Sequence, residues 1–129
     1  MENKDLKVGD LIKASETGNV YYVIAVRNST VIRVSNITDR SVDTLRIPTR
    51  SIEPIPLSEG LLNRIGSIDH FGLGLSFKFK KACVCCFEDE FDFQSKNTKK
   101  RIKYLHELQH ELWDEGININ FKIKDIIDN

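Results

Sequence analysis

The stretch from Thr98 to Gly116, TKKRIKYLHELQHELWDEG, is the only long helical pattern in the chain. Its apolar residues recur at spacings of three and four, so they fall on one helix face: Ile102, Leu105, Leu108, Leu112 and Trp113. Asn97 or Thr98 is suited to cap the start, and Gly116 is suited to end the helix. We therefore predict one long helix over residues 98–115 whose apolar stripe covers a sheet.

The same stretch contains an HExxH string formed by His106, Glu107 and His110. On a helix, two histidines four residues apart share a face and can bind one Zn²⁺, and the glutamate between them can activate a metal-bound water. A catalytic zinc also needs a third protein ligand, and the sequence offers no convincing one. Glu111 places a further charge directly after the string. A solvated helix shoulder is therefore the preferred interpretation, with a small zinc-dependent hydrolase using these three residues as the alternative.

Length and composition bound the protein class. The 129 residues suit one compact domain or two very small ones built together. Nineteen basic residues balance nineteen acidic ones, which removes the overall positive charge typical of nucleic-acid binders. No apolar run is long enough to span a membrane, and the opening MENKDLK has no apolar signal-peptide core. We expect a cytoplasmic protein that does not bind membranes.

The first half of the chain has the pattern of a small β-barrel. Short β-branched and aromatic runs alternate with small polar turns and predict strands over Leu6–Ala14, Val20–Val26, Thr30–Val34 and Ser41–Ile47. All three prolines fall between Pro48 and Pro56, where they end the sheet and redirect the chain. We predict an SH3-like β-barrel over residues 1–56, because antiparallel strands of this length and spacing favour a tightly rolled sheet.

The second half, residues 57–129, predicts an α+β arrangement. Ser58 can cap a short helix over Glu59–Ile65, which Gly66 can end. Alternating phenylalanines and charges then predict an antiparallel meander with strands over Leu75–Lys80, Ala82–Phe87 and Glu90–Phe93. A later alternation over Ile117–Ile123 predicts a strand at the sheet edge. The fold class we expect is therefore α+β: an SH3-like barrel, then a meander packed on one long helix, with the two halves forming one compact unit or two.

Two sequence blocks resemble a family of small proteins common in prophages and mobile elements of Bacteroidota. One is the junction Ile52-Glu53-Pro54-Ile55-Pro56-Leu57 that precedes a short helix, and the other is Tyr104-Leu105-His106 followed by Leu108-Gln109. Both occur in the family's order, with strands between them. The resemblance implies a barrel-like N-terminal half, a β-meander and one long helix, and no known activity. The family pattern has neither an acid at Glu107 nor a histidine at His110, so it lends no support to a shared HExxH site.

Three cysteines, Cys83, Cys85 and Cys86, stand within four residues. An odd count in so short a segment is not a disulfide framework and suits a reducing compartment. In a strand, the first two side chains point to one face and the third to the other. The CxxC spacing lacks the strand-to-helix setting of a redox motif and the second pair of a zinc ribbon. We therefore interpret all three as small residues of the core.

The one basic cluster of the chain precedes the HExxH string. It consists of Lys96, Lys99, Lys100, Arg101 and Lys103. Such a cluster can bind an acidic protein partner or nucleic acid, or it can be an ordinary solvated face balanced by the acids of residues 88–92. We expect a non-enzymatic accessory or interaction protein of a phage or mobile element that uses this cluster as its contact surface. The alternatives are the zinc hydrolase and a nucleic-acid-binding module.

Overall fold

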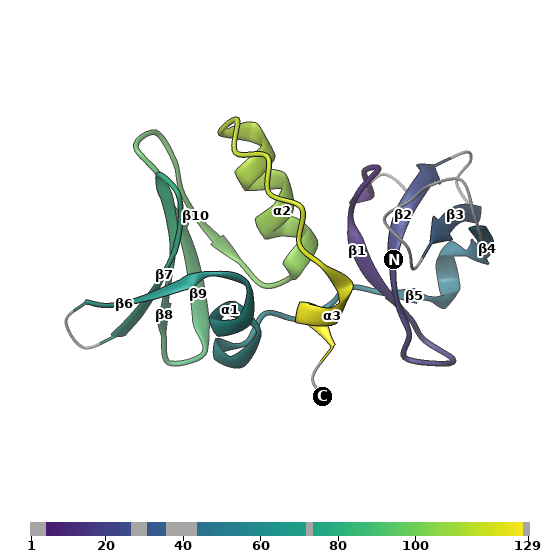
Figure 1. The fold of residues 1–129 in the computed structure, drawn as a ribbon, viewed down its shortest axis with the longest axis horizontal. Helices are drawn as coiled ribbons and strands as arrows, with labels where there is room; N and C mark the ends of the chain where they lie inside the picture. The colour runs from purple at the N-terminus through teal and green to yellow at the C-terminus, as the bar shows by residue number, and fades with distance from the viewer. Residues whose placement is uncertain (1–4, 27–30, 36–43, 72–73, 128–129) are drawn as a thin grey trace. The chain divides into compact units, whose positions relative to one another are not determined.

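A computed structural model describes residues 5–26, 31–35, 44–71 and 74–127 of the chain (Figure 1). The chain divides into two compact units, an N-terminal unit of Met1–Ile55 and a C-terminal unit of Pro56–Asn129. Each unit contains one five-stranded antiparallel sheet, and one of the two sheets curls into a half-barrel. Helices accompany the sheet of the C-terminal unit, so the protein is α+β.

The sheet of the N-terminal unit has the strand order β4-β3-β2-β1-β5. Its strands are β1 (Leu11–Ala14), β2 (Val20–Val26), β3 (Val31–Ser35), β4 (Thr44–Pro48) and β5 (Ile52–Glu53), with a 3₁₀ turn, η2 (Thr49–Ser51), before β5. The last strand returns to the first, because Ala14 pairs with Ile52. The prediction of a strand over Ser41–Ile47 is met from Thr44 onward, and residues 41–43 lie outside the described part of the chain.

The core of the N-terminal unit draws on both ends of its sequence. The apolar cluster contains Leu6, Ile12, Ala14, Tyr21, Val23, Ile32, Val34 and Ile52. A bulge between Val23 and Ala25 interrupts the β2–β3 register, and a bulge increases the local twist of a sheet. The first predicted strand starts at Leu11 rather than Leu6, because Gly9 has a φ of 96° and the Asp10 carboxylate accepts a hydrogen bond from the backbone N–H of Lys7. These contacts form a turn before β1.

The C-terminal unit is a meander in which each strand pairs with its neighbour in sequence. The strand order is β10-β9-β8-β7-β6. Its strands are β6 (Ser67–Phe71), β7 (Gly74–Phe79), β8 (Ala82–Phe87), β9 (Glu90–Gln94) and β10 (Lys99–Ile102), and its helices are α1 (Glu59–Ile65), α2 (Leu105–Asp114) and α3 (Ile123–Ile126). Helices α1 and α2 lie on one side of the sheet (Figure 1). The fully buried Phe77, Val84 and Phe93 share one sheet face and, with Leu105 and Leu108 of α2, belong to the core.

Two local signals of this half are confirmed at the level of individual residues. Helix α1 has the predicted bounds, and the hydroxyl of its N-cap Ser58 accepts a hydrogen bond from the N–H of Leu61 at 3.1 Å. Strand β8 also has the predicted bounds. Strand β6 was not predicted; it pairs with β7 and extends the meander.

The predicted helix over residues 98–115 is wrong in its first third. Residues Lys99–Ile102 form β10, which pairs with β9 from Lys99 opposite Gln94 to Ile102 opposite Phe91. The helix starts only at Leu105, and its N-cap is Tyr104 rather than Asn97 or Thr98. This segment is a strand because it pairs with β9, and because its charges favour that arrangement. Cations in the first turn of a helix would oppose the helix dipole, whereas on β10 Lys100 and Arg101 lie near acidic side chains.

The predicted strand over Ile117–Ile123 is also wrong. Gly116 ends α2 with a φ of 75°, and the N–H of Ile117 donates to the carbonyl of Leu112 at 2.9 Å, which closes the last turn. The following residues run without regular structure up to α3. Ile117 and Phe121 are nonetheless buried, and the ring of Phe121 meets Phe79 edge-on with centroids 6.0 Å apart. The alternating apolar residues of this segment are therefore buried without the segment forming a strand.

Candidate functional site

The glutamate of the HExxH string closes the start of α2. The Oε1 atom of Glu107 accepts hydrogen bonds from the backbone N–H groups of Lys103 at 2.9 Å and Tyr104 at 3.0 Å. These groups lie where the chain turns from β10 into the helix. A carboxylate at the third helical position is suited to this role, because it satisfies backbone donors at the positive end of the helix dipole. In this structure Glu107 therefore caps the start of α2.

The two histidines belong to a row of rings along α2. His106 stacks on Tyr104 with centroids 5.9 Å apart, and its ring lies 5.6 Å from that of His110 at an interplanar angle of 76°. His110 in turn lies 5.7 Å from Trp113. His106 retains only 7% of its exposure, so the expectation that it lies on a solvated shoulder is wrong. The sequence pattern did not indicate that Tyr104 would lie just before the helix and stack on His106.

A catalytic zinc site requires more than this pair of histidines supplies. Within the described ranges, no group of three or more His, Cys, Asp or Glu side chains is placed to hold a metal ion. The described part of α2 thus brings together two of the ligands that the hydrolase alternative needs, and Glu107 is held by backbone donors.

The basic cluster does not form one continuous patch. Lys100 lies on the side of β10 that faces α2, where its Nζ is 3.0 Å from Oε1 of Glu111. That hydrogen bond, with the charge of Glu111, raises the pKa of Lys100. Arg101 lies on the other face, with Nη1 2.7 Å from Oε2 of Glu90 and Nε 3.0 Å from Oδ1 of Asp92. Period-two alternation along a strand, unlike a helix, separates neighbours in this way.

All five cations of the cluster are exposed, and three of them lie beside the edge of the sheet without an ion pair among the described residues. Lys96, Lys99 and Lys103 are exposed, and no ion pair involves them among the residues that the structure describes. Strand β10 ends the sheet, so no further strand pairs with Lys99–Ile102 within the described ranges; just after the strand, the N–H of Leu57 donates to the carbonyl of Lys103 at 2.9 Å. The sequence identified these lysines as part of a basic cluster. Their position at the edge of a sheet follows only from the pairing of β10 with β9.

The three cysteines occupy both faces of β8, as a strand requires. Cys86 is buried on the core face, and its Sγ donates to Oε1 of Glu59 at 3.5 Å. Burial, followed by this contact, raises the pKa of Cys86 to about 11. Cys83 and Cys85 lie half-buried on the opposite face. The interpretation of all three as core residues therefore holds for Cys86 alone.

Comparison with protein families, with curated proteins and with solved structures finds no match to this chain. Among the described residues, no helix is both long and apolar enough to cross a membrane.

Proposed function

We propose that the protein is a non-enzymatic interaction protein whose contact surface is the outer edge of β10. The supporting observation is the exposed Lys99 on a strand that ends the sheet, with exposed Lys96 before it and Lys103 after it. An edge strand carries backbone donors and acceptors that an added strand can pair with. The occupant we propose is an extended acidic segment of a partner protein.

Charge decides between this occupant and a second copy of the same edge. Two copies of β10 would bring their lysines together, and lysines on edge strands disfavour such self-pairing. An acidic segment would instead meet complementary charge, which speeds encounter and sets the register. The predicted contact surface of five cations is thereby narrowed to three, because Lys100 and Arg101 are engaged by acids of their own unit.

The same ion pairs favour a protein partner over nucleic acid. Arg101 is the residue of the cluster best suited to bind a phosphate in a forked geometry, and Glu90 and Asp92 already occupy its guanidinium. The balanced net charge of the chain gives no general attraction to a polyanion.

The N-terminal unit is, in this proposal, an SH3-like barrel. The support is the order β4-β3-β2-β1-β5, in which the last strand returns to pair with the first. The proposed setting is a phage or mobile element, supported by the two sequence blocks around Pro54 and Tyr104. Neighbouring genes of phage modules would support this setting, and an unrelated metabolic operon would contradict it.

The proposed edge contact can be tested with a defined probe. We suggest a fluorescein-labelled peptide of alternating Asp and Val residues, titrated with the full chain and followed by anisotropy. Lys99→Glu should weaken binding about tenfold, or about 1.4 kcal/mol, because it reverses a charge at the contact. Lys122→Glu is the matched control, since Lys122 is also an exposed lysine but lies outside β10. Equal losses in both variants, or tighter binding of a single-stranded oligonucleotide than of the peptide, would refute the proposal.

A further inference from the structure

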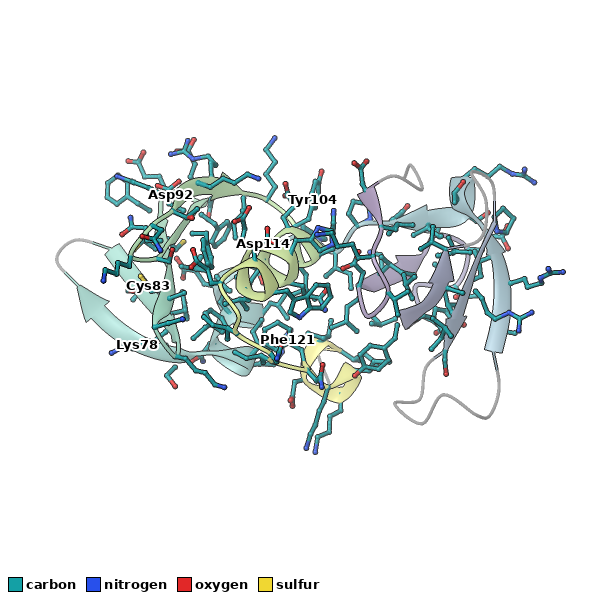
Figure 2. The ribbon with its side chains drawn as sticks, turned by 90° about the horizontal axis from the view of Figure 1, so that it is seen from above. Lys78, Cys83, Asp92, Tyr104, Asp114 and Phe121 are labelled. Carbon is teal, nitrogen blue, oxygen red and sulfur yellow. The ribbon has the colours of Figure 1, made fainter. Side chains whose placement is uncertain are left out.

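Two half-buried thiols lie side by side at the centre of the sheet face opposite the core. Cys83 and Cys85 are separated by one residue on β8, the middle strand of the C-terminal sheet. Their side chains therefore point to the same face, away from the buried Val84 and Cys86. Asp92 and Ser76 stand directly opposite Cys85, and Lys78 and Gln94 stand opposite Cys83. Figure 2 labels Lys78, Cys83 and Asp92 within this sheet.

Strand geometry keeps the two sulfurs from forming a disulfide. Residues two apart on a strand are separated by about 6.7 Å, and their Cβ atoms project in parallel. A disulfide requires Cβ atoms about 3.8 Å apart, so the bond would need β8 to leave the sheet. Pairing on both sides, from Leu75 opposite Cys86 to Cys83 opposite Gln94, opposes that movement.

The same spacing suits a metal ion between the sulfurs. Two metal–sulfur bonds of about 2.3 Å in a line span roughly 4.6 Å, a separation that two side chains leaning toward each other can reach. Linear coordination by two thiolates is a geometry of soft monovalent cations with filled d shells, and thiolates select Cu(I). Zinc, by contrast, takes four ligands in a tetrahedron.

We propose that Cys83 and Cys85 form a two-thiolate binding site for a soft monovalent cation, Cu(I), on the open face of the C-terminal sheet. Each thiol loses its proton to solvent and forms one sulfur–copper bond, and the copper keeps its oxidation state. The product carries one net negative charge, which the exposed Lys78 opposite Cys83 is placed to balance.

The surroundings restrict the site to two ligands. The nearest carboxylate across the strand, that of Asp92, is engaged by Nε of Arg101 at 3.0 Å. The described residues offer no third His, Cys, Asp or Glu ligand positioned to complete a larger site.

The test is transfer of Cu(I) from a coloured bicinchoninate complex to the full chain under anaerobic conditions. We expect one Cu(I) per chain, bound more tightly as the pH rises, because each thiol loses its proton on binding. Cys83→Ser and Cys85→Ser should each weaken binding by more than about a hundredfold, because one of two sulfur–copper bonds is lost. Cys86→Ala, on the same strand but the opposite face, is the matched control and should bind as the unaltered chain does.

Several results would overturn the site. One is the absence of Cu(I) transfer to the unaltered chain, and another is equal affinity in the Cys83→Ser variant. A loss in Cys86→Ala as large as in Cys83→Ser would place the effect in folding, and far-ultraviolet circular dichroism of each variant separates the two. One Cu(I) per two chains would show bridging between molecules and refute the intrachain site. Rapid intramolecular disulfide formation between Cys83 and Cys85 in the folded protein would refute the geometric argument.

Discussion

Replacing Glu107 by alanine removes the acceptor for two backbone N–H groups at the start of α2, those of Lys103 and Tyr104. Both contacts are at the surface or only partly buried, so solvent can replace them in part. Loss of such a cap costs about 1–2 kcal/mol in the free energy of unfolding. Glu107→Gln keeps an acceptor oxygen at the same place without the charge, so we expect less than half of that loss.

The single tryptophan makes this measurement specific to the C-terminal unit. Trp113 lies in α2, so its fluorescence during urea unfolding reports the unit that the substitution affects. For a unit of this size the free energy falls by about 1 kcal/mol per molar urea, and Glu107→Ala should therefore lower the midpoint by about 1–2 M. Asp114→Ala, at the exposed far end of the same helix, is the control and should change stability by less than about 0.5 kcal/mol.

Equal midpoints for Glu107→Ala and Asp114→Ala would refute the capping role. So would a zinc-dependent hydrolytic activity that Glu107→Gln abolishes at unchanged stability, because Glu107 would then act on a metal-bound water. The two variants of Glu107 thus separate the structural role from the catalytic one.

Three further substitutions test the packing of the C-terminal unit. Leu105→Ala should cost about 2–5 kcal/mol in urea unfolding, because Leu105 is fully buried and leaves a cavity; an unchanged midpoint would contradict its place in the core. Gly66→Ala should cost about 1–3 kcal/mol, since its Cβ would lie 2.7 Å from Cζ of the buried Phe79. Gly60→Ala in α1 would make only ordinary contacts, so thermal melting should show that it is neutral or stabilising. Because the pKa of Cys86 rises from 9.0 in the unfolded chain to about 11, its contribution to stability is complete below pH 9 and is lost toward pH 11; Cys86→Ala should remove that part of the stability–pH profile.

Elements with complete local signals were predictable from the sequence. Strand β2 is a nearly unbroken β-branched run, and α1 carries its own cap in Ser58 and its own stop in Gly66; both have the predicted bounds. The end of α2 at Gly116 was likewise readable, because a left-handed φ there favours glycine. In each case the deciding interactions lie within a few residues of sequence.

Elements that depend on distant partners were not predictable in this way. Ile102 fits the apolar stripe of a helix and also the core face of β10, and only its pairing opposite Phe91 decides for the strand. The misplaced helix start also hid the role of Glu107, since a glutamate is recognised as a cap only once it is counted as the third helical residue. The split of the basic cluster was missed for the same reason, because Lys100 and Arg101 point to opposite faces of a strand, whereas on a helix they would be only about 100° apart.

The turn between β9 and β10 fixes how many residues this region can contain. The N–H of Ser95 donates to the carbonyl of Thr98, and Gln94 then faces Lys99 across the turn. Deleting one residue here would exchange the two faces of β10, turning Ile102 toward water and Arg101 toward the core. Inserting two residues preserves the alternation and leaves both ion-pair systems in place. Length variation among natural or engineered variants of this turn should therefore occur in steps of two.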